Sequence, residues 1–167
     1  GPYYRISGRQ NLRFFSDLYR IPRRVKEERV EELLKMVGLE KAADQRVEEY
    51  SRGMKQRLHI ARGLVNDPEI LFLDEPTIGL DPEISREVRG MVREMSKNGK
   101  TLLLTTHNMN EAEELCDVIN MIVGGRIVAK GTISDLKEAV RNKSVVEAEV
   151  QRITPRSWRP SVPLTVF

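Results

Sequence analysis

The sequence has one cysteine, little net charge and no long apolar run. Cys116 has no partner for an internal disulfide, which fits a reducing compartment. The net charge is +3, from 28 basic and 25 acidic residues, and this balance does not favour nucleic acid as a partner. No apolar run is long enough to cross a membrane, and no signal-peptide pattern opens the sequence. These absences predict a cytoplasmic protein.

Apolar residues make up 40% of the 167 residues, enough for one domain with a hydrophobic core, and in the first part they have helical spacing. Ser7 and Gln10 have capping-box spacing at the start of a first helix. The second helix has apolar residues at i, i+3, i+4 and i+7, and Gly38 is placed to end it. A third helix begins near Ser51. The first part is therefore predicted to be helical.

From residue 70 onward, short apolar runs alternate with helical patterns. Residues 70–73 and 101–105 have the composition of strands that are covered on both faces of a sheet. A helix is predicted over residues 83–96, between the two strands, and another through residues 111–116. This order predicts a mostly parallel sheet layered with helices, and therefore an α/β fold.

The end of the sequence predicts a hairpin, a helix, a late strand and a tail. Apolar runs at 118–123 and 126–129 flank Gly124-Gly125, which is a two-residue hairpin signal. Residues 132–141 have helical character, and polar and apolar residues alternate from 146 to 150. The proline-containing stretch that follows is expected to be a loose tail.

Two carboxyl groups and a histidine come after the predicted strands. Asp74 and Glu75 end the first strand, and His107 follows the second. Open α/β sheets bind ligands beyond the carboxyl ends of their strands. An acid there can hold Mg²⁺ on a nucleotide, its neighbour can deprotonate a water, and an imidazole can contact a terminal phosphate. Taken singly, the same residues also fit a strand with a polar end and a structural histidine.

Three more candidates lie at predicted helix starts. Ser51 and Gly53 open the third helix, where free N–H groups and the positive dipole end favour a phosphate. Asp81 comes directly before Pro82, the usual order for an N-cap and the first helical residue. Each of these is also explained by helix capping alone. His59 lies inside an amphipathic helix and is given no role.

In this order and combination, the motifs resemble those of the ATP-binding cassette (ABC) ATPases. The resemblance runs from about residue 8 to residue 136. The signature motif of that family corresponds to Tyr50-Ser51-Arg52-Gly53-Met54-Lys55-Gln56-Arg57, and its Walker B strand to Leu71-Phe72-Leu73-Asp74-Glu75-Pro76-Thr77. Its D-loop corresponds to Gly79-Leu80-Asp81-Pro82, and its switch histidine to the last residue of Thr105-Thr106-His107.

The resemblance implies a fold, a division into domains and two cofactors, ATP and Mg²⁺. The fold would be a partial P-loop NTPase fold, with a mostly parallel sheet, helices and an α-helical subdomain. Residues 1–66 would be the α-helical subdomain with the signature motif at its end. Residues 67–143 would be the RecA-like core portion, and residues 144–167 a partly disordered extension. Asp74 would hold Mg²⁺ through water, Glu75 would be the general base, and His107 would contact the γ-phosphate.

The resemblance also implies partners and a location. Ser51 and Gly53 would bind the γ-phosphate of ATP held by the opposite subunit of a homo- or heterodimer. Asp81 would lie at the dimer interface and couple the two sites. The helices before Ser51 would lean on a transmembrane permease, which places the chain at the cytoplasmic face of the membrane. Transport would then be driven by ATP hydrolysis, and no nucleic acid is expected as a partner.

Two departures from the family pattern limit this expectation. The family signature is Leu-Ser-Gly-Gly-Gln, whereas this chain has Tyr50, Arg52 and Met54 at the first, third and fifth places. A P-loop, G-x-x-x-x-G-K-[ST], is absent, because Gly99-Lys100-Thr101 would need a glycine where Glu94 stands. We therefore expect this chain by itself to bind ATP poorly and hydrolyse it scarcely at all, as a fragment or a natural truncation would.

Two alternatives remain open from the sequence. The chain could be a non-catalytic interaction module that docks on a membrane partner or caps another cassette. It could also be the C-terminal lobe of a DNA-repair type ABC ATPase, in which a coiled coil separates the two lobes. The sequence before Ser51 has no sustained heptads, which disfavours the second alternative.

Overall fold

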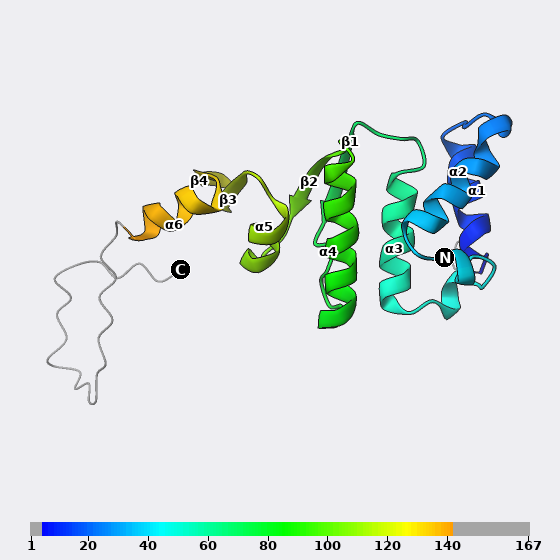
Figure 1. The fold of residues 1–167 in the computed structure, drawn as a ribbon, viewed down its shortest axis with the longest axis horizontal. Helices are drawn as coiled ribbons and strands as arrows, with labels where there is room; N and C mark the ends of the chain where they lie inside the picture. Colours follow the sequence, from blue (N-terminus) through cyan, green and yellow to red (C-terminus); the bar gives the residue numbers. More distant parts are fainter. Residues whose placement is uncertain (1–4, 142–167) are drawn as a thin grey trace, which may run out of the picture. The chain divides into compact units, whose positions relative to one another are not determined.

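The computed structural model describes residues 5–141, which divide after residue 119 into two compact units (Figure 1). The strand predicted over residues 146–150 and the extension predicted over residues 144–167 lie outside the described residues. No helix in the described part of the chain combines the length and the apolarity needed to cross a membrane. The predicted division at residues 66 and 143 stays a prediction.

Three helices open the first unit: α1 (Gly8–Leu18), α2 (Arg23–Met36) and α3 (Arg52–Gly63). Short 3₁₀ turns, η2 (Glu40–Ala42) and η3 (Val47–Glu49), lie between α2 and α3. The predicted capping box is present, because the Ser7 side chain accepts from the Gln10 amide and the Gln10 side chain accepts from the Ser7 amide. Gly38 follows the end of α2 with a φ of 65°, as predicted. The three predicted helices are confirmed.

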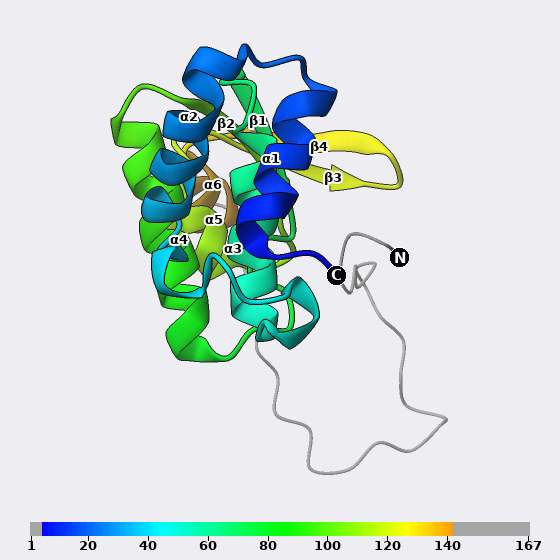
Figure 2. The ribbon, with the colours of Figure 1, turned by 90° about the vertical axis from the view of Figure 1, so that its right-hand side faces the viewer.

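The three helices pack on one another around a shared apolar core (Figure 2). Each contributes side chains with at most 1% of their surface exposed, such as Leu12 from α1, Leu33 and Leu34 from α2, and Leu58 from α3. Burial of such side chains is the main favourable term in folding. This core holds α3 in place, and α3 begins directly after Ser51.

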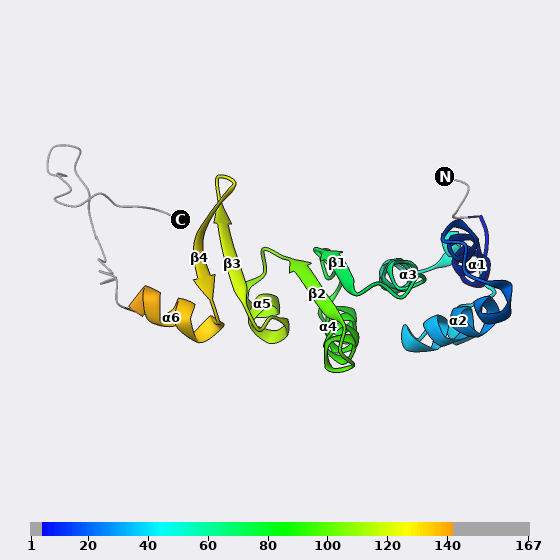
Figure 3. The ribbon, with the colours of Figure 1, turned by 90° about the horizontal axis from the view of Figure 1, so that it is seen from above.

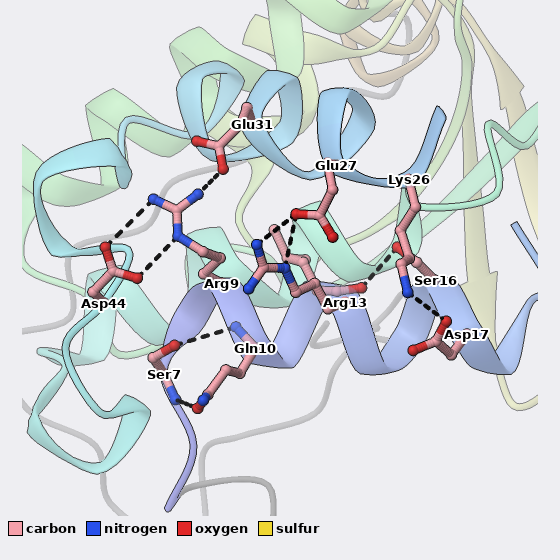
Figure 4. A network of polar contacts seen from close by, with 11 residues as sticks. Ser7, Arg9, Gln10, Arg13, Ser16, Asp17, Lys26, Glu27, Glu31 and Asp44 are labelled. Atoms are coloured by element: carbon pink, nitrogen blue, oxygen red, sulfur yellow. Dashed lines mark hydrogen bonds and ion pairs between the residues drawn. The ribbon is translucent and has the colours of Figure 1, made fainter. Parts of the chain in front are cut away.

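Ion pairs tie α1 to its neighbours at the surface (Figure 4). The Arg9 guanidinium group donates a hydrogen bond to Asp44 in the segment after η2, and this bond lowers the pKa of the Asp44 carboxyl group. Exposed ion pairs contribute little to stability one by one, so the apolar core remains the main support of this packing. The pairs between the two helices are Arg9–Glu31, Arg13–Glu27 and Lys26–Asp17.

The second half of the first unit is a strand–helix–strand motif: β1 (Ile70–Asp74), α4 (Pro82–Lys97) and β2 (Thr101–Thr105). The two strands are parallel, with Ile70 opposite Thr101 and Asp74 opposite Thr105. Asp81 caps α4 through the Ile84 amide, and Pro82 is its first residue. The predicted parallel pairing and the predicted helix start are confirmed.

Only one face of this pair of strands is buried, so the prediction of strands covered on both faces is wrong. Leu71 and Leu73 are 5% and 6% exposed, and Leu71 lies against α3 near Gly63. On the other face, exposure reaches 49% for Ile70, 70% for Phe72 and 49% for Leu103. The cause is that α3 and α4 of the first unit pack on the face that carries Leu71 and Leu73, while apolar composition alone does not say how many faces are covered.

A short helix, α5 (Met109–Leu115), follows β2 and is fastened to α4. Glu114 of α5 accepts from Arg89 Nε at 2.6 Å and from Arg93 Nη2 at 2.7 Å. Asn108 caps α5, because its side chain accepts from the amides of the second and third helical residues, Asn110 and Glu111. These contacts fix the first turn of α5 close to the end of β2.

The second unit contains a hairpin and a helix. Strands β3 (Ile119–Val123) and β4 (Arg126–Gly131) run in opposite directions around Gly124-Gly125, as predicted (Figure 3). β3 begins at Ile119, the last residue of the first unit. Helix α6 (Ile133–Arg141) follows and packs against β4. It starts with a capping box in which Thr132 and Asp135 each accept from the other's amide.

The one-sided burial of β1 leads to a stability prediction. Leu71→Ala should lower the free energy of unfolding by about 2–5 kcal/mol, because it empties a buried site, whereas Phe72→Ala should change it by less than about 1 kcal/mol. Urea unfolding of the 167-residue chain, followed by circular dichroism, measures both. An equal loss in the two variants would show that Phe72 is covered.

Candidate functional site

Asp74 and Glu75 occupy the carboxyl end of the parallel pair. Asp74, the last residue of β1, is exposed, and its carboxyl group accepts a hydrogen bond from the Thr105 hydroxyl on β2. The Glu75 amide donates to the Thr105 carbonyl at 3.0 Å, which extends the pairing by one step. The backbone of β2 thus sets the position of both carboxyl groups.

Glu75 and His107 are in direct contact. Glu75 Oε1 accepts from the His107 amide at 3.1 Å and lies 2.8 Å from His107 Nδ1. Glu75 also has a φ of 45°, a left-handed conformation that is uncommon outside glycine and costs on the order of 1–3 kcal/mol. Such a conformation persists only where neighbouring contacts hold it, and the pairing with Thr105 and His107 supplies such contacts.

The charge of Glu75 changes the titration of His107. The hydrogen bond and the charge of Glu75 raise the pKa of His107, and the charge of Glu111 acts more weakly in the same direction. The imidazole side chain is 72% exposed, so it remains accessible to a ligand. The other histidine differs, because desolvation and the charge of Arg62 lower the pKa of His59.

Ser51 and Gly53 lie at the start of α3 and both have structural roles there. The Ser51 hydroxyl accepts from the Met54 amide at 3.2 Å, so Ser51 is the N-cap. Gly53 is buried against α4, where an added Cβ would overlap Ile84 Cγ2. The exposed Ser51 side chain stays accessible, but the need for glycine at position 53 follows from helix packing alone.

Asp81 lies at the start of α4, next to these residues. Its side chain accepts from the Ile84 amide at 3.0 Å, and Ile84 is the residue that packs on Gly53. The candidate residues therefore form two groups. Asp74, Glu75 and His107 meet at the carboxyl ends of β1 and β2. Ser51, Gly53 and Asp81 lie where the first turns of α3 and α4 are in contact.

The donor set at Asp74 suits a magnesium ion that comes with a nucleotide. Among the described residues, no group of three or more histidine, cysteine or acidic side chains could hold a metal ion by itself. Asp74 offers an exposed carboxyl group, with an oxygen of Thr105 beside it. Mg²⁺ commonly keeps several waters and binds one or two carboxylates plus phosphate oxygens, so this sparse set fits.

One buried group was missed from the sequence. Glu111 is 1% exposed, and its carboxyl group accepts from the hydroxyls of Thr77 and Thr106. The stretch around it, Asn108-Met109-Asn110-Glu111, is mostly polar, and nothing in its pattern marks one of its side chains as buried. A glutamate at the third helical position after an Asn cap predicts a capping box instead.

Comparison with known proteins finds relatives among ABC transporter proteins. The sequence model of the family described as "ABC transporter" matches residues 4–78. A fluoroquinolones export ATP-binding protein of Mycobacterium tuberculosis is 44% identical over 143 residues, covering 86% of this chain and 46% of the relative. A Nod factor export ATP-binding protein I of Neorhizobium galegae is 44% identical over 139 residues, covering 83% of this chain and 40% of the relative.

Solved structures show the same fold. The chain superposes on cbiO1 of Clostridium perfringens, part of the ABC transporter complex cbiONQ, with a TM-score of 0.74 and 32% identity, over 84% of this chain and 57% of that one. A dimeric ATP-binding cassette in a post-hydrolysis state, bound to ADP and Pi, gives a TM-score of 0.65 and 27% identity, over 77% of this chain and 57% of that one.

These likenesses define the fold as that of an ABC ATPase, the α/β P-loop NTPase fold predicted from the sequence. In sequence and in fold, the chain is similar to the proteins of the ATP-binding cassette family. It spans less than half the length of the two export proteins named above, 46% and 40%. The activity and partners of a whole cassette are therefore proposals for this chain.

The Glu75–His107 contact predicts a pH effect that NMR can measure. His107 should titrate above the ordinary value of 6.5, and Glu75→Gln should bring it back toward that value. Because the folded-state pKa is raised, the stabilisation is complete below the ordinary pKa and is lost as the pH rises through the raised one. His59 is the internal control and should titrate below His107 in both proteins. Identical His107 titrations in wild type and variant would contradict the contact.

Proposed function

We propose that this chain is part of an ATP-binding and ATP-hydrolysing subunit of an ABC transporter, in which ATP hydrolysis drives transport across a membrane. The observation that carries this proposal is the contact between Glu75 and His107 beside Asp74, at the carboxyl ends of two parallel strands. Open α/β sheets bind nucleotides at this edge. An acid that can hold Mg²⁺, a second acid that can deprotonate water and an imidazole that can contact a phosphate are groups that suit phosphoryl transfer to water.

Each of the three side chains has a distinct task in this proposal. Asp74 would hold Mg²⁺ through water, and the ion would supply positive charge for the phosphate oxygens. Glu75 accepts the proton of the attacking water. Oε1 contacts His107, so Oε2 is the oxygen that takes this proton. His107 donates to the γ-phosphate, and its raised pKa keeps more of the imidazole in the form that carries both N–H groups.

The second group of residues serves a site shared between subunits. The Ser51 hydroxyl and the free amides at the start of α3 contact the γ-phosphate of ATP held by another cassette, with Gly53 keeping that turn close to α4. Asp81 couples the two sites from the start of α4. The 167 residues contain no P-loop motif, so the phosphate cradle in this proposal is supplied from outside them.

The partners and the location follow from the same proposal. The relatives are named as export ATP-binding proteins, and cbiO1 is described as part of an ABC transporter complex. By analogy, the partners are a transmembrane permease and a second cassette, and the chain is bound peripherally to the cytoplasmic face of the membrane. This analogy also favours the transporter over the DNA-repair alternative.

The role of Glu75 is tested by kinetics in an assembly that supplies the P-loop. Glu75→Gln should lower kcat for MgATP by about 10²–10⁴-fold while ATP binding is retained, because the amide cannot accept the proton of water. Turnover is measured by phosphate release and binding by equilibrium titration. Glu69→Gln is the matched control, since Glu69 is exposed and precedes β1. Unchanged turnover in Glu75→Gln would remove Glu75 from this role.

A further inference from the structure

Glu111 is a buried acid that the proposed chemistry does not use. It lies in the first turn of α5, and 1% of its surface is exposed. Oε1 accepts from the Thr77 hydroxyl at 2.8 Å, and Oε2 accepts from the Thr106 hydroxyl at 2.6 Å. A buried carboxyl group is costly unless its oxygens are hydrogen-bonded, and both oxygens of Glu111 are.

The two threonines lie next to the two residues that meet at the site. Thr77 follows Glu75 by two positions, and Thr106 directly precedes His107. Thr77 and Glu111 are 34 positions apart in the sequence, so their contact joins separate loops. The Thr106 hydroxyl also accepts from the Asn108 amide, which fixes the backbone on the other side of His107.

We propose that Glu111, Thr77 and Thr106 form a clamp that positions Glu75 against His107. Glu111 is thus a positioning residue that acts through the backbone of two loops and does not itself meet the nucleotide. The importance of the clamp for catalysis rests on the proposed function. The effect of the clamp on the Glu75–His107 contact is independent of that proposal, because the contact exists without a ligand.

The clamp acts from a fixed base. Arg89 and Arg93 of α4 hold Glu114, one turn after Glu111 on α5. Helix α4 in turn begins just after the loop that carries Thr77. The loop with Thr77 leads into α4, α4 is bound to α5 through Glu114, and α5 is bound back to the loop through the Glu111–Thr77 hydrogen bond. Thr77 and α5 therefore cannot move independently of each other.

The conformation of Glu75 makes such a clamp necessary. Its φ of 45° is unfavourable for a residue with a side chain, so the loop would relax if the contacts around it were lost. The strand pairing holds the loop before Glu75, through the bond from its amide to Thr105. The Thr77–Glu111 bond holds it after Glu75. The Ile78 amide also donates to the Glu75 carbonyl at 3.1 Å, so removing the Thr77–Glu111 bond loosens this segment without freeing it and lets the carboxyl group move away from His107.

The test is NMR titration of His107 in the 167-residue chain without nucleotide. Thr77→Val removes the hydroxyl while keeping the charges of Glu75 and Glu111, the acids that raise the pKa of His107. The His107 titration should shift from the wild-type pH toward the pH found in Glu75→Gln. Thr77→Ser keeps the hydroxyl and should restore the wild-type value. Thr101→Val, at the start of β2, is the matched control and should leave it unchanged.

A wild-type His107 titration in a folded Thr77→Val would overturn the clamp, even if the variant were less stable. If Thr77→Val does not fold, Thr106→Val is judged by the same criterion with Thr106→Ser as its rescue. In the ATP-hydrolysing assembly, Thr77→Val should lower kcat by about 10–10²-fold with little change in KM. If the assembly with the wild-type chain does not hydrolyse ATP, the proposed function is overturned. The His107 titration would still show whether the clamp positions Glu75.

Discussion

The parallel pairing of β1 and β2 is the constraint on which the candidate site depends. Asp74 lies opposite Thr105, and one further bond, from the Glu75 amide to the Thr105 carbonyl, places Glu75 beside His107. Side chains alternate between the faces of a strand, so a shift of one residue would turn Leu71 and Leu73 away from the core. The core that buries these two leucines therefore also fixes the geometry of the acids beyond them.

Much of this arrangement could be predicted because it depends on local chemistry. Capping residues at Ser51 and Asp81 mark helix starts by their own hydrogen bonds, and an apolar run that ends in Asp74 and Glu75 marks a strand end. The rest depends on contacts between distant segments. The sequence predicted that both faces of β1 would be covered, but Phe72 is 70% exposed, because burial depends on which elements pack on the sheet. Glu111 was missed for the same reason, since its partner Thr77 is 34 positions away.

The six candidate residues are held in two different ways. Asp74, Glu75 and His107 are held by strand pairing and by one another, and one of them, Glu75, has an unfavourable backbone conformation. The residues at the starts of α3 and α4 are held by ordinary capping bonds and close helix packing. Strain concentrated in the first group is typical of groups that are held ready for a reaction, whereas unstrained helix starts are typical of surfaces that receive a ligand.

The close packing at Gly53 affects how variation at this position should be interpreted. Any larger residue there would meet Ile84 of α4 and push the two helices apart. Glycine would therefore be retained at this point with or without nucleotide binding, because the two helices have to fit together. An unchanging glycine across many sequences thus records a steric requirement first. Ser51 is likewise retained by its capping bond to the Met54 amide, so neither residue by itself would record selection for phosphate binding.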